Sequence, residues 1–315
     1  CSSDLLRINM KMNVSDIIVK IMEKEGITDA FGIPGAGING LYKYMAQTEV
    51  IKHYTVRHEE CAVHAAGGYF RASHKIAAAI CTSGPGATNF VTGLYTCNID
   101  SIPVLALTGQ AVTGQLGKDP FQCVDIAAIC KPIAKATFCV TNPIAIPEVM
   151  REAFRLMREG KPGPVVVDLP LDVQNAEIDY DIDSYTPAAW ENPKANDDQI
   201  TEAIKMLKEA KNPVIIMGGG VVLADACEEL VKFAEKMQIP VITTYQAKGC
   251  IPYNHPLNAG HCGIQVGQPI GNKIFSESDV VLGIGCRFTD RHTGAIGIYT
   301  ENKKFKAKMN YADKT

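Results

Sequence analysis

A glycine-rich segment and an acidic residue that follows it carry the first chemical signal in this chain. Residues 32–40 (GIPGAGING) contain a formal GxGxxG pattern after a predicted strand, and Glu59 follows about 20 residues later. In a dinucleotide site, such glycines approach a pyrophosphate and the acid binds a ribose. A tight strand-to-helix turn without any ligand explains the glycines equally well. Both interpretations stay open on these residues alone.

Residues 57–60 (RHEE) and 82–89 (TSGPGATN) supply a carboxylate, hydroxyls and further glycines. A carboxylate at a helix start stabilises the helix dipole by about 0.3–1 kcal/mol, which is the plain structural explanation of Glu59. The apolar strand before Glu59 instead favours the carboxyl end of a parallel sheet, where ligands bind. In 82–89, backbone N–H groups can face a bound group. A hydrolase nucleophile at Ser83 is disfavoured, because the GxSxG elbow is absent.

Two later segments could approach a phosphate. The glycines 218–220 follow the predicted strand 213–217, and 287–294 (RFTDRHTG) follows the predicted strand 279–284. Glycines permit close backbone approach to a pyrophosphate, and two arginines at a strand end suit its charge. Three glycines alone are a weak signal, however, and a solvated charged loop explains the arginines equally well. Neither segment decides whether a phosphate is bound.

The composition excludes several classes of protein. The chain has 315 residues, room for about two domains. Its 46% hydrophobic content is that of a globular protein, and its net charge of −3 argues against nucleic-acid or membrane-surface partners. No apolar run approaches the ~18–20 residues of a membrane helix. Eleven cysteines without a CxxC pair predict reduced thiols in a cytoplasmic protein and no metal site in this chain.

Alternating helices and short apolar strands must position these residues. Helices are predicted at 13–25, 39–47, 59–73, 87–97, 147–159, 197–210 and 224–237, and strands at 29–33, 51–57, 77–82, 104–108, 161–170, 213–217, 240–244 and 279–284. Continuous apolar strands between helices predict an α/β fold with two doubly wound parallel-sheet domains. A polar, proline-containing stretch divides them, which gives a domain at 12–175, a linker at 176–196 and a domain at 197–315.

Seven phrases, taken together and in order, resemble the thiamine-diphosphate enzymes of the acetolactate synthase and glyoxylate carboligase family. They are EGITDAFGIPG, VRHEECAVHAAGGY, TSGPGATN, DSIPVLALTGQ, PFQCVDI, GKPGPVVVDLPLDV and GCRFTDRHTG, and they run from about residue 13 to 300. The resemblance implies a pyrimidine-binding domain at 12–175 and a central FAD-binding domain, incomplete, at 197–315. It displaces the nicotinamide interpretation of the first glycine segment.

The resemblance also implies roles for individual residues. Glu59 falls on the glutamate that hydrogen-bonds the thiamine pyrimidine and promotes the tautomer that removes the thiazolium proton. Phe121 and Gln122 match the loop over the reacting carbon, and with Glu59 they form the expected catalytic set. Gly35, Thr82 and Asn89 match the pyrimidine side. The expected FAD contacts are Lys161, Gly218, Gly219, Gly263, Arg287 and Arg291, with a lysine at 161 where relatives carry an arginine.

The family implies a third domain, whose GDG…N motif holds Mg²⁺ and the diphosphate. No GDG occurs in this chain. The resemblance therefore implies the front part of a longer enzyme, inactive when isolated, that forms a homodimer or homotetramer.

The phrases favour glyoxylate as the 2-oxo acid substrate, with pyruvate, as in acetolactate synthase, the alternative. Glyoxylate carboligases carry valine at the position of Glu59, and relatives carry an acid at the position of Gly67. A nicotinamide-dependent oxidoreductase and a non-catalytic flavin-binding relative are the alternatives of another class.

Overall fold

The computed structural model describes residues 11–263 and 267–293, which divide into two compact units between Asn192 and Pro193. Each unit is an α/β sandwich around a parallel sheet, so the predicted fold class is confirmed. No helix among the described residues is long and apolar enough to cross a membrane. The part of the predicted second domain at 294–315 lies outside the described residues.

The first unit is built on a parallel sheet in the order β3-β2-β4-β5-β7-β6. Its strands are β2 (Asp29–Gly32), β3 (Lys52–Thr55), β4 (Ala78–Cys81), β5 (Leu105–Gln110), β6 (Ala136–Cys139) and β7 (Val165–Pro170). The three central strands β4, β5 and β7 are buried along their whole length, because helices cover both faces of the sheet. An antiparallel pair, β1 (Lys11–Asn13) and β8 (Glu177–Asp179), lies apart from this sheet.

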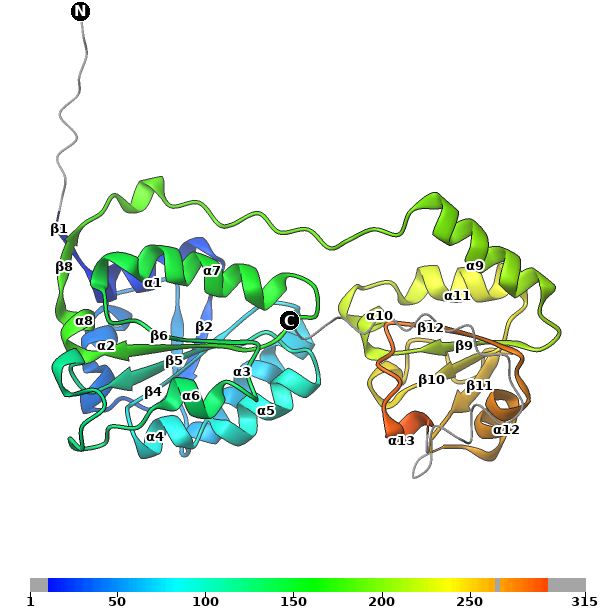
Figure 1. Cartoon of the computed structure of the whole chain (residues 1–315), viewed down its shortest axis with the longest axis horizontal. Helices are drawn as coiled ribbons and strands as arrows, with labels where there is room; N and C mark the ends of the chain where they lie inside the picture. Colours follow the sequence, from blue (N-terminus) through cyan, green and yellow to red (C-terminus); the bar gives the residue numbers. More distant parts are fainter. Residues whose placement is uncertain (1–10, 264–266, 294–315) are drawn as a thin grey trace, which may run out of the picture. The chain divides into compact units, whose positions relative to one another are not determined.

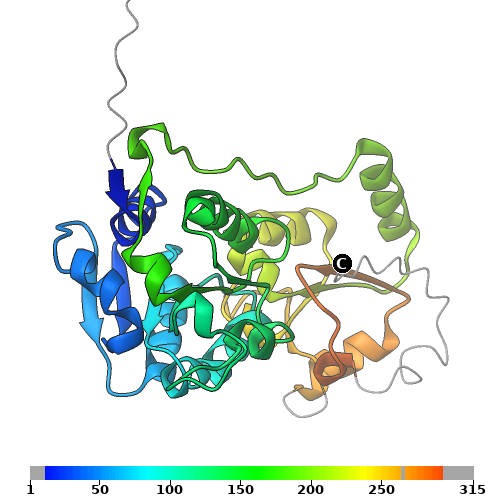
Figure 2. The same cartoon turned by 60° about the vertical axis from the view of Figure 1, so that its left-hand side comes forward.

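Helices form two layers on the first sheet (Figures 1 and 2). One face carries α1 (Val14–Lys24) and α7 (Ile146–Arg158), whose apolar sides meet the strands in one core. The other face carries α3 (Glu59–Ser73) and α5 (Val91–Ile99), which pack on each other. Shorter helices are α2 (Asn39–Met45), α4 (Pro85–Thr88), α6 (Ile126–Cys130) and α8 (Leu171–Asn175), with 3-10 turns at Ala36–Ile38, Thr113–Gln115, Pro143–Ala145 and Ile182–Ser184.

The second unit carries a parallel sheet in the order β11-β10-β9-β12 among its described residues. The strands are β9 (Pro213–Met217), β10 (Val241–Thr243), β11 (Asn258–His261) and β12 (Val280–Ile284). Its helices are α9 (Asp197–Glu209), α10 (Gly219–Leu223), α11 (Cys227–Met237), α12 (Pro269–Glu277) and α13 (Asp290–Thr293), with a 3-10 turn at Tyr245–Ala247. A capping box between Asn196 and Gln199 starts α9.

Several elements differ from the sequence-based expectation. The predicted helix 87–97 is two helices, α4 and α5, and the predicted helix 224–237 is α10 followed by α11. Asp225, in the left-handed region at φ 52°, lies between α10 and α11 and ends the first of them. Strands β6 and β11 and helix α12 carry no clear periodic signal, and they were not predicted.

The segment between the units is structured at its start. Ile178 on β8 and Tyr185 are buried against the first unit, and the Tyr185 hydroxyl donates to Glu25 Oε1 at 2.7 Å. Arg158 Nη1 donates to the other oxygen of Glu25 at 2.5 Å. Only after Tyr185 does the chain become extended and exposed, as Figures 1 and 2 show.

Candidate functional site

The carboxyl ends of the first unit's strands bring together the segments that the sequence analysis singled out. After β2 the chain turns toward β3 on one side, and after β4 it turns toward β5 on the other. In open α/β sheets, ligands bind at this point, where the strand order reverses. The segments 33–38 and 82–89 follow β2 and β4, so they lie on either side of that point.

The two segments are held together by close contacts. The Gly37 N–H donates to Thr82 Oγ1 at 3.1 Å. A Cβ built on Gly35 would stand 2.6 Å from Thr82 Cβ, so only glycine fits there. A Cβ on Gly37 would similarly meet Ser83 Oγ at 2.7 Å. The glycines of 32–40 therefore permit packing between loops. The helix that follows, α2, has only seven residues, which weakens the comparison with a dinucleotide-binding helix.

Glu59 and Asn89 form a hydrogen-bonded pair next to these loops. Glu59 is half-buried in the first turn of α3, which begins after His58 caps it by accepting from the Glu60 N–H at 3.3 Å. Asn89 Nδ2 donates to Glu59 Oε2 at 2.8 Å. A Cβ on Gly86 would lie 2.8 Å from Thr82 Cγ2 and 3.3 Å from Glu59 Oε1. Gly86 therefore packs closely between Thr82 and the second carboxylate oxygen, with no room for a side chain.

The two residues of the expected covering loop are placed differently. Gln122 lies against Gly84, where a Cβ would come within 2.8 Å of Gln122 Cβ. Both residues have positive φ, 61° at Gly84 and 52° at Gln122, a region that glycine adopts without cost. Phe121 is 85% exposed and points away from the packed loops. The structure thus brings Gln122, but not the Phe121 side chain, to the segment 82–89.

Sequence reasoning missed three buried polar residues beneath these loops. Gln110, Asp168 and Gln174 are at most 2% exposed. Gln174 Nε2 donates to the carbonyl oxygens of Gly37 and Leu169, both at 2.7 Å, and so supports the first glycine segment. Asp168 accepts from the Thr108 hydroxyl at 2.7 Å and from Gln110 Nε2 at 2.9 Å. Polar residues inside otherwise apolar strands, as in VVVDLP, were the available signal.

Burial dominates the electrostatics of this network. It raises the pKa of Asp168 to about 6, although hydrogen bonds from Thr108, Gln110 and Cys139 act in the opposite direction. Asp168 in turn adds to the effect of burial on Cys139, whose pKa rises to about 12. Neither Asp168 nor Cys139 makes a described hydrogen bond to Glu59, so this network supports the loops from below.

The residues expected to contact FAD lie in both units. In the first unit, Lys161 Nζ donates to the Asn98 carbonyl at 2.5 Å. The other five lie in the second unit, at the carboxyl edge of its sheet, where β9 and β12 flank the reversal of strand order. A Cβ on Gly263 would stand 2.6 Å from the Arg291 carbonyl oxygen, so the structure brings these two segments together.

The glycines of the second unit are explained by packing between loops. A Cβ on Gly218 would stand 2.2 Å from the Gly285 carbonyl oxygen, and one on Gly219 would stand 2.7 Å from Gln246 Cβ. The Gly218 N–H donates to Ile284 O at 2.9 Å, so it is already engaged. Arg287 and Arg291 are exposed next to this packed turn. The arginines, rather than the glycines, are the groups here that suit a phosphate.

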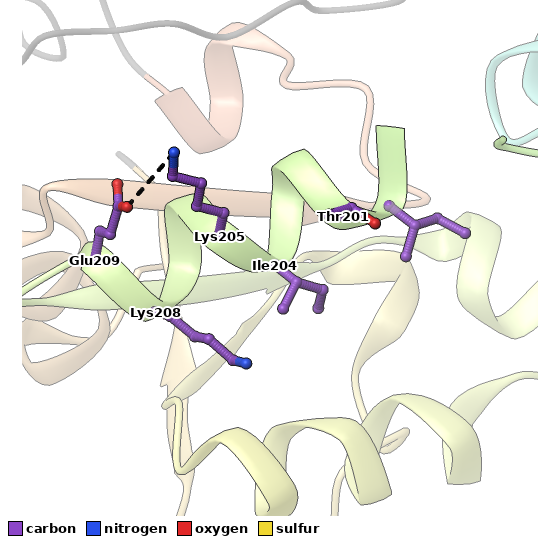
Figure 3. A pocket seen from close by; sticks show the side chains of 6 residues that line it. Thr201, Ile204, Lys205, Lys208 and Glu209 are labelled. Carbon is purple, nitrogen blue, oxygen red and sulfur yellow. Dashed lines mark ion pairs between the residues drawn. The ribbon is translucent and has the colours of Figure 1, made fainter. Parts of the chain in front are cut away.

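A hollow of about 410 Å³ lies along α9, away from all the predicted residues. It is lined by Ile200, Thr201, Ile204, Lys205, Lys208 and Glu209 (Figure 3). Lys205 and Glu209 form an ion pair on its wall at 3.9 Å, and both side chains are exposed to solvent. Such pairs contribute little and offer no oriented catalytic group, so we place the candidate site at the Glu59–Asn89 pair.

A parallel sheet with a carboxylate–amide pair at the reversal of strand order defines an α/β cofactor-binding protein. Comparison with known families identifies which kind. Residues 12–129 match the thiamine pyrophosphate enzyme N-terminal TPP binding domain, and residues 200–311 match the central domain of the same enzymes. The chain belongs to the thiamine pyrophosphate enzymes and carries these two of their domains.

Individual relatives agree with this assignment. A glyoxylate carboligase of Escherichia coli O157:H7 is 48% identical over 295 residues, which cover 93% of this chain and 50% of the relative. A probable acetolactate synthase large subunit of Methanococcus aeolicus is 44% identical over 302 residues, with 93% and 49% covered. An acetolactate synthase large subunit of Corynebacterium glutamicum is 43% identical over 300 residues, with 93% and 47% covered. The chain thus spans about half the length of the curated relatives it matches.

Proposed function

We propose that the protein carrying this chain is a thiamine-diphosphate-dependent carboligase. It would decarboxylate a 2-oxo acid and join the remaining carbon unit to a second carbonyl compound. Glyoxylate is the proposed substrate, and two molecules would give tartronate semialdehyde and CO2. The observation that carries this proposal is the Glu59–Asn89 hydrogen bond of 2.8 Å beside Gly35 and Thr82, in a chain that matches the TPP binding domain.

Glu59 is the proton-handling residue in this proposal. Its Oε2 is held by Asn89, and no described residue donates a hydrogen bond to Oε1. An oriented carboxyl oxygen suits exchange of a proton with a pyrimidine ring nitrogen. When bound, thiamine diphosphate supplies the electron sink for decarboxylation. Gly35 and Thr82 shape the pyrimidine side, and Phe121 and Gln122 belong to the loop proposed to cover the reacting carbon.

Mg²⁺ and the diphosphate are proposed to be held by a further domain, as the family resemblance implies. The chemistry of the described site fits this division. Its polar groups are one carboxylate, one amide and hydroxyls from Thr82 and Ser83, which suit a pyrimidine better than a phosphate. A pyrimidine presents ring nitrogens and an amino group, so a mixed set of donors and acceptors is what it needs.

FAD is a proposed second cofactor, bound in the second unit at Gly218, Gly219, Gly263, Arg287 and Arg291. The family resemblance alone implies Lys161 as a further FAD contact. The exposed arginines next to the packed turn at Gly218 support this part of the proposal. Replacing Arg287 by Gln should lower the FAD content of the purified protein. Exposed Lys232, which pairs with Glu228 on α11, offers the matched control Lys232→Gln. Equal flavin absorbance in the two variants would contradict the assignment.

The proposed partners are a small 2-oxo acid and further copies of the chain, as a homodimer or homotetramer. A cytoplasmic location is proposed as well. The described cysteines are all free, which is consistent with a reducing compartment. The net charge of −3 gives no support to nucleic acid or a membrane surface as a partner.

Acetolactate synthase is the second candidate function, with pyruvate as the substrate. Two observations favour it. The family resemblance implies valine in glyoxylate carboligases at the position where this chain has Glu59, and two acetolactate synthase large subunits are 44% and 43% identical to it. The 48% identical glyoxylate carboligase and the phrases quoted above favour the first candidate. For this chain, both candidates assign roles to the same residues, and they differ in the acid consumed and in the product formed.

The deciding experiment offers glyoxylate and pyruvate separately to the complete natural protein and identifies the product. The proposal expects CO2 release that requires thiamine diphosphate and Mg²⁺, with tartronate semialdehyde formed from glyoxylate. Acetolactate as the main product would establish the second candidate. Tight binding of NADH without binding of thiamine diphosphate would overturn both and favour an oxidoreductase, whereas bound FAD without turnover would favour a non-catalytic flavin-binding relative.

A further inference from the structure

Gln110, the last residue of β5, bonds both ends of the loop 111–124 that carries Phe121 and Gln122. Its Oε1 accepts from the Ala111 N–H at 2.9 Å, at the start of the loop. Its Nε2 donates to the Val124 carbonyl oxygen at 2.7 Å, at the end of the loop. Gln110 is only 2% exposed, so these bonds are shielded from water. One side chain thereby closes the loop.

Asp168 on the neighbouring strand β7 fixes which way this amide points. Asp168 Oδ2 accepts from Gln110 Nε2 at 2.9 Å, and Oδ1 accepts from the Thr108 hydroxyl at 2.7 Å. An ionised carboxylate only accepts hydrogen bonds, so it requires the NH₂ end of Gln110 on its side. The amide oxygen must then face Ala111. Asp168 is 1% exposed, and its position in the β5–β7 ladder is rigid.

The closed loop reaches the candidate site through a tight contact at Gln122. Gln122 lies against Gly84, and Gly84 belongs to the segment 82–89 that also carries Thr82 and Asn89. A side-chain bond elsewhere in the loop, from Lys118 Nζ to Gly114 O at 2.8 Å, is internal to the loop and does not anchor it. Thr113 is tied to Asp172 near the loop's start. The second half of the loop, with Gln122, therefore depends on the bond at Val124.

We propose that Gln110 and Asp168 are positioning residues that close the loop 111–124 and set the place of Gln122 against Gly84. They act on orientation of the 2-oxo acid and not on proton exchange at Glu59, which is held by Asn89 independently of the loop. The catalytic part of this inference rests on the proposed function. The closure of the loop does not, because it follows from the hydrogen bonds alone.

Two variants break the closure in different ways. Gln110→Met keeps the length of the side chain and removes all three hydrogen bonds. Asp168→Ala removes both accepting oxygens, so the NH₂ end of Gln110 loses the partner that directs it toward Val124. Val167→Ala is the matched control, because Val167 is fully buried on the same strand and takes no part in these side-chain bonds.

Limited trypsin digestion of the full chain reports loop closure without needing activity. The exposed Lys118 offers a cleavage site inside the loop. Losing a buried hydrogen bond worth about 1–1.5 kcal/mol should speed cleavage after Lys118 about tenfold in Gln110→Met and Asp168→Ala. In Val167→Ala, trypsin should cleave after Lys118 at the wild-type rate, once the contribution of global unfolding, measured in parallel, is subtracted. Unchanged cleavage in both closure variants, or equal acceleration in the control, would overturn the inference.

Kinetics of the complete natural protein test the catalytic part. In Gln110→Met, the KM for the 2-oxo acid should rise about tenfold, while proton exchange at the thiazolium C2 should stay within about twofold of wild type. A parallel fall of exchange and turnover would overturn the positioning role. A complete lack of carboligase activity in the wild type would refute the proposed function instead, and the trypsin result would still decide whether Gln110 closes the loop.

Discussion

The two units place their candidate residues at the same point of similar sheets but use different means to build it. In the first unit, Glu59 and Asn89 are joined through their side chains, above a buried network around Asp168. In the second unit, Gly218 packs its backbone against Gly285, and the arginines beside it remain exposed. The difference teaches that similar glycine-rich strand ends can carry a hydrogen-bonded carboxylate–amide pair in one unit and exposed arginines beside a packed turn in the other.

The pH dependence of stability should differ most between the units. The pKa of Asp168 is raised from 3.8 to about 6, so its contribution to stability is fully present below the unfolded pKa and is lost as pH rises through about 6. The shift corresponds to a loss on the order of 3 kcal/mol between pH ~4 and ~7. The free energy of unfolding of wild type relative to Asp168→Asn should fall by this amount over that interval.

Hydrogen exchange measured strand by strand would show which strands lose protection as Asp168 ionises. The described buried polar residues of the second unit are Thr243, Thr244 and Ser278, none of which titrates there. Protection of β5 and β7 should therefore follow the titration of Asp168, while that of β9 and β12 should not. Other titratable groups also face Asp168: Asp125 and the thiols of Cys81, Cys123, Cys130 and Cys139. Burial raises the pKa of the Cys81, Cys130 and Cys139 thiols further above the interval in which Asp168 titrates. An equal pH effect in both sheets would contradict the contrast.

Asn89→Ala should reduce activity of the complete protein without unfolding the first unit. A hydrogen bond to a charged group is worth about 1.5–3 kcal/mol, which corresponds to about a ten- to hundredfold loss in kcat/KM. Thr88→Ala, next in the chain, removes only a hydroxyl bonded to the Pro85 carbonyl and serves as the control. Activity within twofold of wild type in Asn89→Ala would show that Glu59 does not need this partner.

Gly218→Ala should act on the fold of the second unit rather than on a ligand. The new Cβ would stand 2.2 Å from the Gly285 carbonyl oxygen, and such overpacking costs about 1–3 kcal/mol of stability. Urea unfolding followed by probes in each unit should show an earlier transition only in the second. A loss of FAD with unchanged stability would mean instead that the glycine is reserved for the cofactor.

Replacing either of two adjacent glycines on α3 by alanine gives the smallest expected change in stability. The two changes should differ in size or in sign. Gly68 has open space around it, so Gly68→Ala should stabilise the first unit by about 0.5–1 kcal/mol. Gly67→Ala would place a Cβ 2.9 Å from Cys97 Sγ, which should offset that gain or reverse it. Thermal unfolding of the two variants compares them directly, and equal stabilisation by both would contradict the packing shown here.

The sequence predicted the parallel sheets and the identity of the loops, because continuous apolar strands and strand-end glycines leave strong local signals. The predicted helix 59–73 and strand 213–217 match α3 and β9 at both ends. Strand β6 was missed because its four residues, Ala136–Cys139, are half-exposed at the sheet edge and lack an apolar run.

The support beneath the site could not be predicted in the same way. Gln110, Asp168 and Gln174 support the loops through hydrogen bonds to distant residues. Val124 lies 14 residues from Gln110, and Gly37 lies 137 residues from Gln174. Local sequence patterns do not reveal such pairs. The packing reason for Gly218 was missed for the same cause, since Gly285 lies far along the chain. A glycine that accommodates another loop looks the same in sequence as one that accommodates a ligand.

The most direct test compares Glu59→Gln with Glu60→Gln in the complete natural protein, by following exchange of the thiazolium C2 proton of bound thiamine diphosphate. Both glutamates lie in the first turn of α3, but Glu60 pairs with His64 at 3.3 Å and Glu59 with Asn89. The account predicts that Glu59→Gln slows exchange by about 10²–10⁴-fold, while Glu60→Gln leaves it within about twofold of wild type. Near-normal exchange in Glu59→Gln would contradict the central claim.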